Sequence, residues 1–145
     1  MANVFDAAKY ILERMGPMSA MKLQKLVYYA QAWSLVWDDA PLFNSRIEAW
    51  ANGPVVRELY NVHRGSFIVS PTDFASLTSE KLTDIQRETV DAVLEAYGNR
   101  SAQWLSDQTH AEDPWRMARE GMNEGERGER EITLESMSEY YSSLQ

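Results

Sequence analysis

Only a few residues of this chain have the type and spacing that catalysis or metal binding would need. The sequence contains two histidines and no cysteine, which excludes disulfides, thiolate zinc sites and a cysteine nucleophile. Asp107, His110 and Asp113 follow one another at three-residue intervals and could offer one nitrogen and two oxygens to a cation. Three ligands from one short loop would need further ligands, however, and Asp113, which precedes a proline, is better explained as a helix N-cap. A metal-dependent enzyme is therefore only an alternative interpretation.

The other histidine, His63, offers no clearer site. It lies beside Arg64 near the predicted end of a helix, where a positive charge suits the helix dipole, so its favoured role is structural. The sequence also lacks the glycine-rich loops that cradle phosphates and the serine nucleophile elbow of hydrolases. We predict no enzymatic activity and no cofactor.

Arginines next to aromatic side chains favour a binding function instead. Arg57, Asn61 and Arg64 recur at i, i+4 and i+7 of a predicted helix and share one edge with Tyr60 at its flank. Aromatic residues beside arginine are typical anchors of protein interfaces. This edge is a candidate contact surface, and a plain solvated helix face is the alternative. The predicted partner-binding residues are Arg57, Tyr60, Asn61, Arg64, Trp115, Arg116 and Arg119.

The tryptophans separate the expected core from the expected surface. Trp33, Trp37 and Trp104 lie in apolar helical patterns, which predicts that they are buried. Trp50 and Trp115 each sit beside a turn among polar neighbours, so we expect them to be partly exposed.

One stretch dominates the elements that must position these side chains. From Leu26 to Trp37 the chain carries no charge, and its apolar residues fall on every side of a helical projection. A helix of this kind, predicted for residues 19–38, has to be surrounded by other elements. The charge-free run is shorter than the roughly 20 apolar residues that cross a bilayer, so we expect no membrane span.

Shorter elements are predicted on both sides of this helix. Apolar residues three or four apart, together with capping residues, predict helices, and polar–apolar alternation around Ile47 predicts a short strand. Pro54 sits where the first residue of a helix belongs, and Glu131–Thr133 could form a strand that pairs near Ile47. The predicted helices are residues 4–15, 55–64, 84–97, a short one after Ser101, one from Pro114 to about Glu120, and a last one after Thr133.

These elements add up to a mainly α fold. We predict one compact multi-helix domain, residues 1–145, around a buried central helix at about 19–38, with at most a small two-stranded β-ribbon. A chain of 145 residues buries about 68–70% of its unfolded surface, which suffices for a real core.

The charge balance bears on the class of partner. The net charge is −8, and residues 111–145 contribute −5 of it through nine acidic residues against four arginines. Nucleic acid is an unlikely partner because lysine and arginine supply most non-specific affinity for phosphates. A basic protein is the easier match, and solubility alone is the alternative explanation. The N-terminal residues show no signal-peptide pattern, so we expect a cytoplasmic protein.

Four blocks of sequence carry a family resemblance. They are Met21–Trp33 (MKLQKLVYYAQAW), Pro41–Phe43 (PLF), Glu48–Val55 (EAWANGPV) and Thr109–Trp115 (THAEDPW), and they cover about residues 18–120. In these blocks the sequence resembles the Panacea-domain (SocA-like) antitoxins and their phage-associated relatives.

The resemblance implies a mainly helical domain that neutralises a cognate toxin by direct protein–protein contact. Members of this family are paired with toxins of unrelated kinds. The resemblance does not indicate which toxin this protein binds or what oligomeric state the protein has. It also implies an alternative, a proteolytic adaptor that presents the toxin to a AAA+ protease. A DNA-binding autoregulator that uses the Arg57–Arg64 helix is a further alternative.

The resemblance also implies that the matched residues form the shared scaffold. They are Met21, Lys22, Leu23, Lys25, Leu26, Tyr28, Tyr29, Trp33, Trp50, Gly53, Pro54, His110 and Pro114. Lys22 and Lys25 stand out because cations are disfavoured at the N-terminal end of a helix. We expect them to pair with an acid such as Glu48, and contact with a partner is the alternative.

Overall fold

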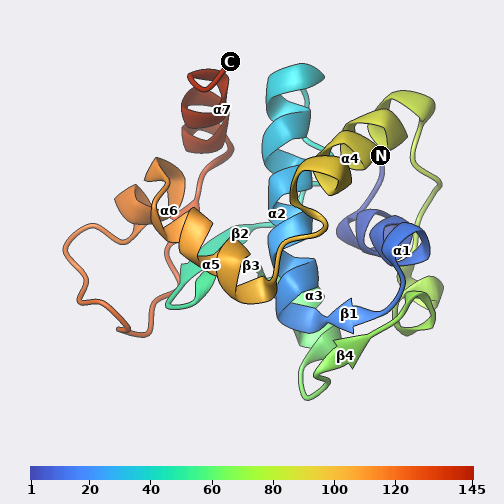
Figure 1. The fold of residues 1–145 in the computed structure, drawn as a ribbon, viewed down its shortest axis with the longest axis horizontal. Helices are drawn as coiled ribbons and strands as arrows, with labels where there is room; N and C mark the ends of the chain where they lie inside the picture. Colours follow the sequence, from blue (N-terminus) through green and yellow to red (C-terminus); the bar gives the residue numbers. More distant parts are fainter.

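The computed structural model describes residues 1–145, and helices dominate it (Figure 1). The helices are α1 (Val4–Met15), α2 (Ala20–Trp37), α3 (Arg57–His63), α4 (Asp84–Tyr97), α5 (Ala102–His110), α6 (Asp113–Ala118) and α7 (Leu134–Ser142), with short 3₁₀ turns at Pro71–Asp73 and Ala75–Leu77. The strands are β1 (Met18–Ser19), β2 (Ile47–Trp50), β3 (Gly53–Val56), β4 (Ile68–Val69) and β5 (Glu131–Ile132).

Helix α2 runs through the middle of the molecule, as the sequence predicts. Helices α1, α4, α5 and α7 and the β2–β3 hairpin all contact it (Figure 1). Thirteen of its eighteen residues are buried, and one hydrophobic cluster extends from Ala2 to Tyr141 around it. The predicted mainly α class with a central buried helix is confirmed.

Two of the tryptophans predicted to be buried are not. Trp33 is 8% exposed, but Trp37 is 44% exposed and Trp104 is 36% exposed. Trp37 is the last residue of α2, where its ring stacks on Trp33 at a centroid distance of 4.9 Å and the helix end leaves much of the side chain open to solvent. Apolar periodicity therefore predicted the helix correctly and its burial incorrectly at this end.

The strands form two small antiparallel sheets rather than one ribbon. The pairing predicted from sequence is present, since Ile47 lies opposite Ile132 in the β2–β5 pair. The second sheet, β1–β4, was not predicted. Strand β2 lies between β3 and β5, so that the C-terminal strand is joined to the hairpin that precedes α3.

The prediction that Pro54 opens a helix is wrong. Gly53–Val56 pairs with β2 as an edge strand, a position that tolerates proline because no partner needs its missing N–H. Helix α3 begins at Arg57 instead. A long-range contact decides this, because the Gln24 amide accepts from Val56 N at 2.8 Å and donates to Val56 O at 3.2 Å.

A second buried glutamine of α2 fixes the chain after the helix. Gln31 is 0% exposed. Its Oε1 accepts from Leu42 N at 2.7 Å and Phe43 N at 3.2 Å, and its Nε2 donates to Phe43 O at 2.8 Å. Both glutamines therefore act as clamps that satisfy buried backbone groups, as the core requires.

We predict that Gln31→Leu lowers the free energy of unfolding by about 2–4 kcal/mol, because three buried backbone groups of Leu42 and Phe43 lose their partners. Urea unfolding followed by tryptophan fluorescence measures the change. The matched control is Gln103→Leu at an exposed position of α5, which should change stability by less than about 0.5 kcal/mol. Equal changes in the free energy of unfolding for the two substitutions would contradict a specific stabilising role for the hydrogen bonds of Gln31.

Candidate partner-binding site

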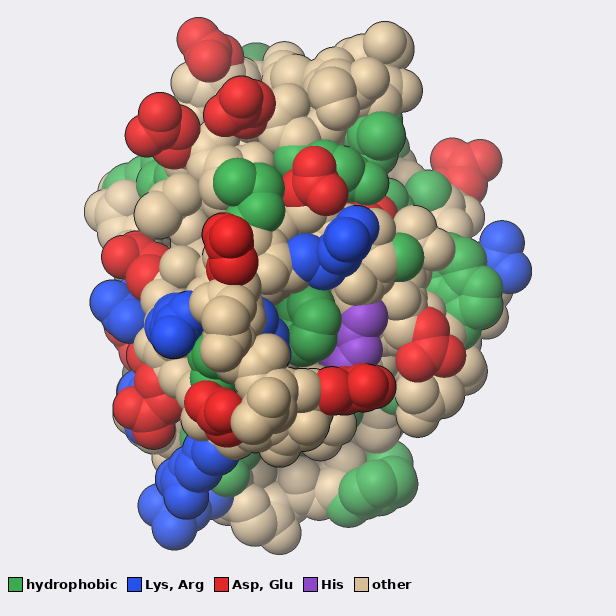
Figure 2. Space-filling model, turned by 90° about the vertical axis from the view of Figure 1, so that its left-hand side faces the viewer, with side chains coloured by type: hydrophobic (Ala, Val, Ile, Leu, Met, Phe, Trp, Pro, Cys, Tyr) green, Lys and Arg blue, Asp and Glu red, His purple; other side chains and the backbone are tan.

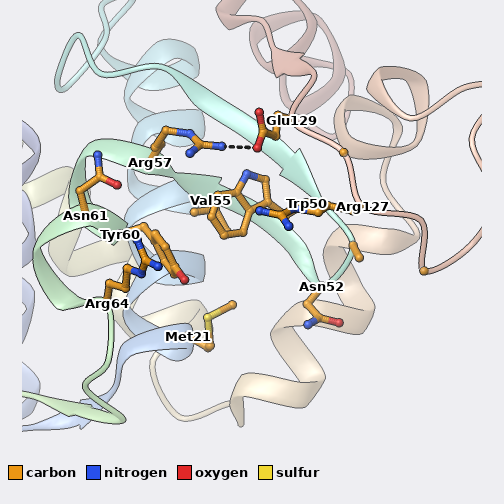
Figure 3. A pocket seen from close by; sticks show the side chains of 13 residues that line it. Met21, Trp50, Asn52, Val55, Arg57, Tyr60, Asn61, Arg64, Arg127 and Glu129 are labelled. Carbon is orange, nitrogen blue, oxygen red and sulfur yellow. Dashed lines mark ion pairs between the residues drawn. The ribbon is translucent and has the colours of Figure 1, made fainter.

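A cavity of about 330 Å³ lies beside α3, between the β2–β3 hairpin and residues 125–129. All four of the partner-binding residues predicted on the α3 edge line it, namely Arg57, Tyr60, Asn61 and Arg64 (Figure 3). The hairpin contributes Trp50 and Asn52, α2 contributes Met21, and the C-terminal segment contributes Arg127 and Glu129.

Trp50 lies in the middle of the side chains that line this cavity (Figure 3). Its ring meets Tyr60 edge-on at a centroid distance of 4.8 Å, and the guanidinium of Arg57 lies 5.3 Å from its centroid. The indole Nε1 donates to Glu48 Oε1 at 2.9 Å. Trp50 is thus held rigidly and half-buried, as a preorganised aromatic contact surface would be.

Glu48 fixes the side chains around the cavity through hydrogen bonds. It is 5% exposed and accepts from Arg57 Nε at 3.1 Å and from Arg46 Nε at 3.2 Å, besides Trp50. Burial raises the pKa of its carboxyl, but the hydrogen bonds from Arg57 and Trp50 and the charge of Arg57 outweigh burial and lower the net pKa below its ordinary value. Glu48 therefore stays ionised and fixes the arginines.

The C-terminal segment closes one side of the cavity through Glu129. Its carboxylate lies 2.8 Å from Arg57 Nη2, the ion pair drawn in Figure 3, and its backbone carbonyl accepts from Arg46 Nη2 at 2.9 Å. Sequence reasoning missed both Glu48 and Glu129 as site residues. Glu48 carried a signal, a charged residue inside an alternating strand pattern, whereas Glu129 lies in a glycine- and charge-rich stretch that gives none.

Helix α6 supports the site rather than lining it. Trp115 is half-buried and donates from Nε1 to Trp50 O at 2.8 Å. Arg119 is 6% exposed and donates to Ala49 O at 3.0 Å and Glu126 O at 2.6 Å. The expectation that Arg119 faces a partner is therefore corrected, because its guanidinium serves internal carbonyls. Arg116 is exposed but does not reach the cavity.

The expected pairing of Lys22 or Lys25 with Glu48 is wrong. Glu48 is occupied by the two arginines, and neither lysine takes part in an ion pair. Lys25 is 1% exposed and its Nζ has no hydrogen-bond partner.

The side chains considered for a metal site do not converge. No three histidine or acidic side chains of the chain lie close enough together to hold a metal ion. Asp107 accepts from Gln103 at 2.9 Å, and His110 stacks on Trp115 at a centroid distance of 4.0 Å. Asp113 is the first residue of α6 and not its N-cap, a position that Glu112 holds.

Charge around the cavity differs from that of the whole chain. Three arginines and one glutamate line it, and Arg64 and Arg127 form no ion pair. The face that carries α6 and the C-terminal segment shows basic and acidic side chains interspersed, without a continuous patch of either sign (Figure 2). The cavity is therefore a local positive site on an acidic protein, and its open groups can contact carboxylates or carbonyl oxygens.

The domain is mainly helical and presents a cavity lined by aromatic and arginine side chains, which are typical of protein-binding surfaces. The chain belongs to the antitoxin SocA-like, Panacea domain family, whose sequence model matches residues 23–116. This confirms the resemblance seen in the four sequence blocks. Membership of an antitoxin family indicates a role in a toxin–antitoxin system and a toxin as the general class of partner.

The matched region leaves out α1, β1, β5 and α7, together with the first residues of α2 and the last residues of α6. No curated protein and no solved structure matches the chain. None of the helices has the length and apolar character that crossing a membrane would require.

We predict that Glu48→Gln lowers the free energy of unfolding at pH 7 by about 1–3 kcal/mol, because the arginines lose a buried counter-charge. The value is modest because both arginines are partly exposed. A carboxyl whose pKa folding lowers adds stability above its unfolded pKa of about 4.3 and loses that contribution as the pH falls through the folded pKa. The difference between wild type and variant should therefore shrink below about pH 4 in urea-unfolding series.

The matched control for this prediction is Glu131→Gln. Glu131 is half-exposed and lies 3.6 Å from Arg46, so its loss should cost less than about 0.5 kcal/mol at any pH. A Glu48→Gln deficit that stays constant down to pH 3 would contradict a charge-based role for Glu48.

Proposed function

We propose that this protein is an antitoxin that neutralises a cognate toxin by binding it directly, and that the cavity beside α3 is part of the contact surface. The family assignment supports a toxin as the partner. The observation that carries the choice of surface is the cavity itself, where Trp50, Tyr60 and Arg64 present aromatic and cationic groups that internal contacts leave available. Such groups dominate protein interfaces.

The lining of the cavity indicates what the partner presents there. Trp50 and Tyr60 offer apolar ring surface, and Arg64 and Arg127 are cations that form no ion pair. An apolar side chain flanked by a carboxylate or by backbone carbonyls would match both features. The whole-chain charge favours a basic partner, but this contact favours an acidic group at its centre.

We further propose that residues 1–145 act as one unit in the cytoplasm. The hydrophobic cluster from Ala2 to Tyr141 links the N-terminal helix to the C-terminal one, so the parts outside the matched region belong to the same core. The absence of cysteine suits a reducing compartment.

Coexpression with the product of an adjacent gene tests the antitoxin function. Expression of that product alone should stop growth, and coexpression of this chain should restore it while the two copurify. The amount of toxin is measured in the same cells, because direct blocking predicts an unchanged half-life and a proteolytic adaptor predicts a shorter one. An adjacent product that is harmless alone would remove the support for the proposal.

We predict that Arg64→Glu and Tyr60→Ala each weaken toxin binding about tenfold or more, which corresponds to about 1.4 kcal/mol, while the unfolding midpoint stays close to that of the wild type. Isothermal titration calorimetry measures both affinities. Arg57→Glu is less suitable because Arg57 also holds Glu48.

The matched control is Arg100→Glu, an exposed arginine that lies over Trp104, away from the cavity. It should bind the toxin like the wild type. Wild-type affinity in both cavity variants would move the contact surface elsewhere on the protein.

A further inference from the structure

A second cavity, of about 270 Å³, lies between α2, α5 and the turn of the β2–β3 hairpin. Lys25, His110, Asn52, Gln103 and Ser106 line it. It adjoins the cavity beside α3, because Met21 and Asn52, both labelled in Figure 3, line both cavities. Among the polar side chains that line it, Gln103 and Ser106 make hydrogen bonds, whereas one buried nitrogen of Lys25 and one of His110 make none.

The two unengaged atoms are Lys25 Nζ and His110 Nε2. They are the only buried side-chain nitrogen or oxygen atoms of the protein without a hydrogen-bond partner. Buried polar atoms are nearly always paired in folded proteins, so two orphans in one cavity call for a common explanation. The structure supplies none from within the chain.

Of the two unpaired atoms, Nζ of Lys25 carries the larger free-energy cost. The residue is 1% exposed, and burial lowers the pKa of its ammonium to about 8, so it remains largely protonated at pH 7. An uncompensated charge in the interior is strongly unfavourable. Gly53 leaves the space that this side chain fills, because a Cβ at that position would lie 2.5 Å from Lys25 Cε. The hairpin is therefore shaped around the lysine.

The neighbouring polar groups donate their hydrogen bonds to partners other than Lys25. The hydroxyl of Thr109 donates to Ser106 O at 2.7 Å, and the hydroxyl of Ser106 donates to Asn52 O at 2.6 Å. Gln103 donates to Asp107 on the exposed side of α5. No carboxylate of the chain lies within ion-pair distance of the ammonium, so its counter-charge has to come from another molecule.

His110 is positioned for the same purpose. Its ring stacks on Trp115 at 4.0 Å with an interplanar angle of 15°, and Trp115 is fixed by its bond to Trp50 O. Burial, and after it the charge of Lys25, lowers the pKa of His110, so the imidazole is neutral near pH 7 and can offer one N–H. The two orphan nitrogens together provide one cation and one neutral donor.

We propose that this second cavity binds a carboxylate group, held by the ammonium of Lys25 and by Nε2–H of His110. One negative charge and two acceptor oxygens match one cation and two donors. A phosphate dianion matches less well, because the lining provides a single cation and because, besides the positive charge of Arg119, the negative charges of Asp107 and Glu124 also act on His110. A metal cation would be repelled by the ammonium. This proposal stands independently of the proposed antitoxin function.

Acetate is the probe that tests this site. ¹⁵N-histidine spectra are recorded at pH 7 while sodium acetate replaces sodium chloride at constant ionic strength. The Nε2 signal of His110 should shift and saturate, and that of His63, which does not line the cavity and whose Nε2 lies 2.9 Å from Gln24 Nε2, should shift less. An unresponsive His110 signal, or an equal or larger response to phosphate, would overturn the proposal.

Lys25→Met supplies a readout that a merely structural lysine would not give. The side chain keeps its length and loses its charge, so the acetate-dependent shift of His110 should disappear while the thermal midpoint without acetate rises by several degrees. Lys22→Met, three residues earlier on the same helix and half-exposed, should keep the acetate response. Acetate binding that survives in Lys25→Met would overturn the assignment.

If Lys25→Met does not fold, His110→Phe provides a second test of the site. Phenylalanine preserves the stacking on Trp115 and removes Nε2, so acetate should raise the thermal midpoint at a concentration at least tenfold higher than in the wild type. An unchanged acetate dependence would exclude His110 from the site. Comparing acetate with N-acetylglutamate amide distinguishes the sources of the carboxylate, since a pocket for a protein side chain accepts both and a pocket for a free small acid accepts acetate alone.

Discussion

The burial of α2 from Leu23 to Ser34 is the constraint on which the rest of this structure depends. Along this segment no polar side chain can reach water, so each polar group needs an internal partner. Gln24 finds that partner in Val56, and Gln31 finds it in the backbone at Leu42 and Phe43. These contacts place β3 and the chain after α2, and through β3 they place the start of α3. The position of the α3 cavity therefore depends on hydrogen bonds that are made in the core.

The same constraint shapes the opposite side of α2 through Glu112. This buried carboxylate accepts from Tyr29 and Tyr141, each at 2.8 Å, and so links α2, the start of α6 and α7. Burial raises the pKa of Glu112 more than the tyrosine hydrogen bonds lower it, so the cluster bears an electrostatic cost in order to fix the C-terminal helix. Glu48 plays the corresponding part at the site, where arginines from the strand region and α3 meet it. Lys25 is the exception, because its position in the core is fixed and no partner in the chain satisfies it.

Local sequence patterns predicted helices and strands well where interactions between neighbouring residues determine the structure. Capping boxes form at Asn3 with Asp6 and at Thr83 with Gln86, since each needs only a four-residue segment. The charge-free run predicted a buried helix because no other environment suits it. Prediction failed where distant residues decide, as at Pro54, whose strand depends on Gln24 and β2. Prediction also failed for Arg119, which was expected to face a partner. In the structure its guanidinium donates hydrogen bonds to carbonyls of β2 and of the C-terminal segment.

The sequence by itself therefore determined the helical class, the central helix, the pairing of Ile47 with the C-terminal strand and the family, since periodicity, capping and motif blocks are properties of neighbouring residues. It also placed four of the cavity residues on one edge of α3, because helical spacing fixes which side chains share a face. Only the tertiary structure decided which charges meet. Glu48 joins Arg57 and not a lysine, and Lys25 lies beside His110 with both nitrogens unpaired, because such encounters depend on how segments far apart in the chain pack together.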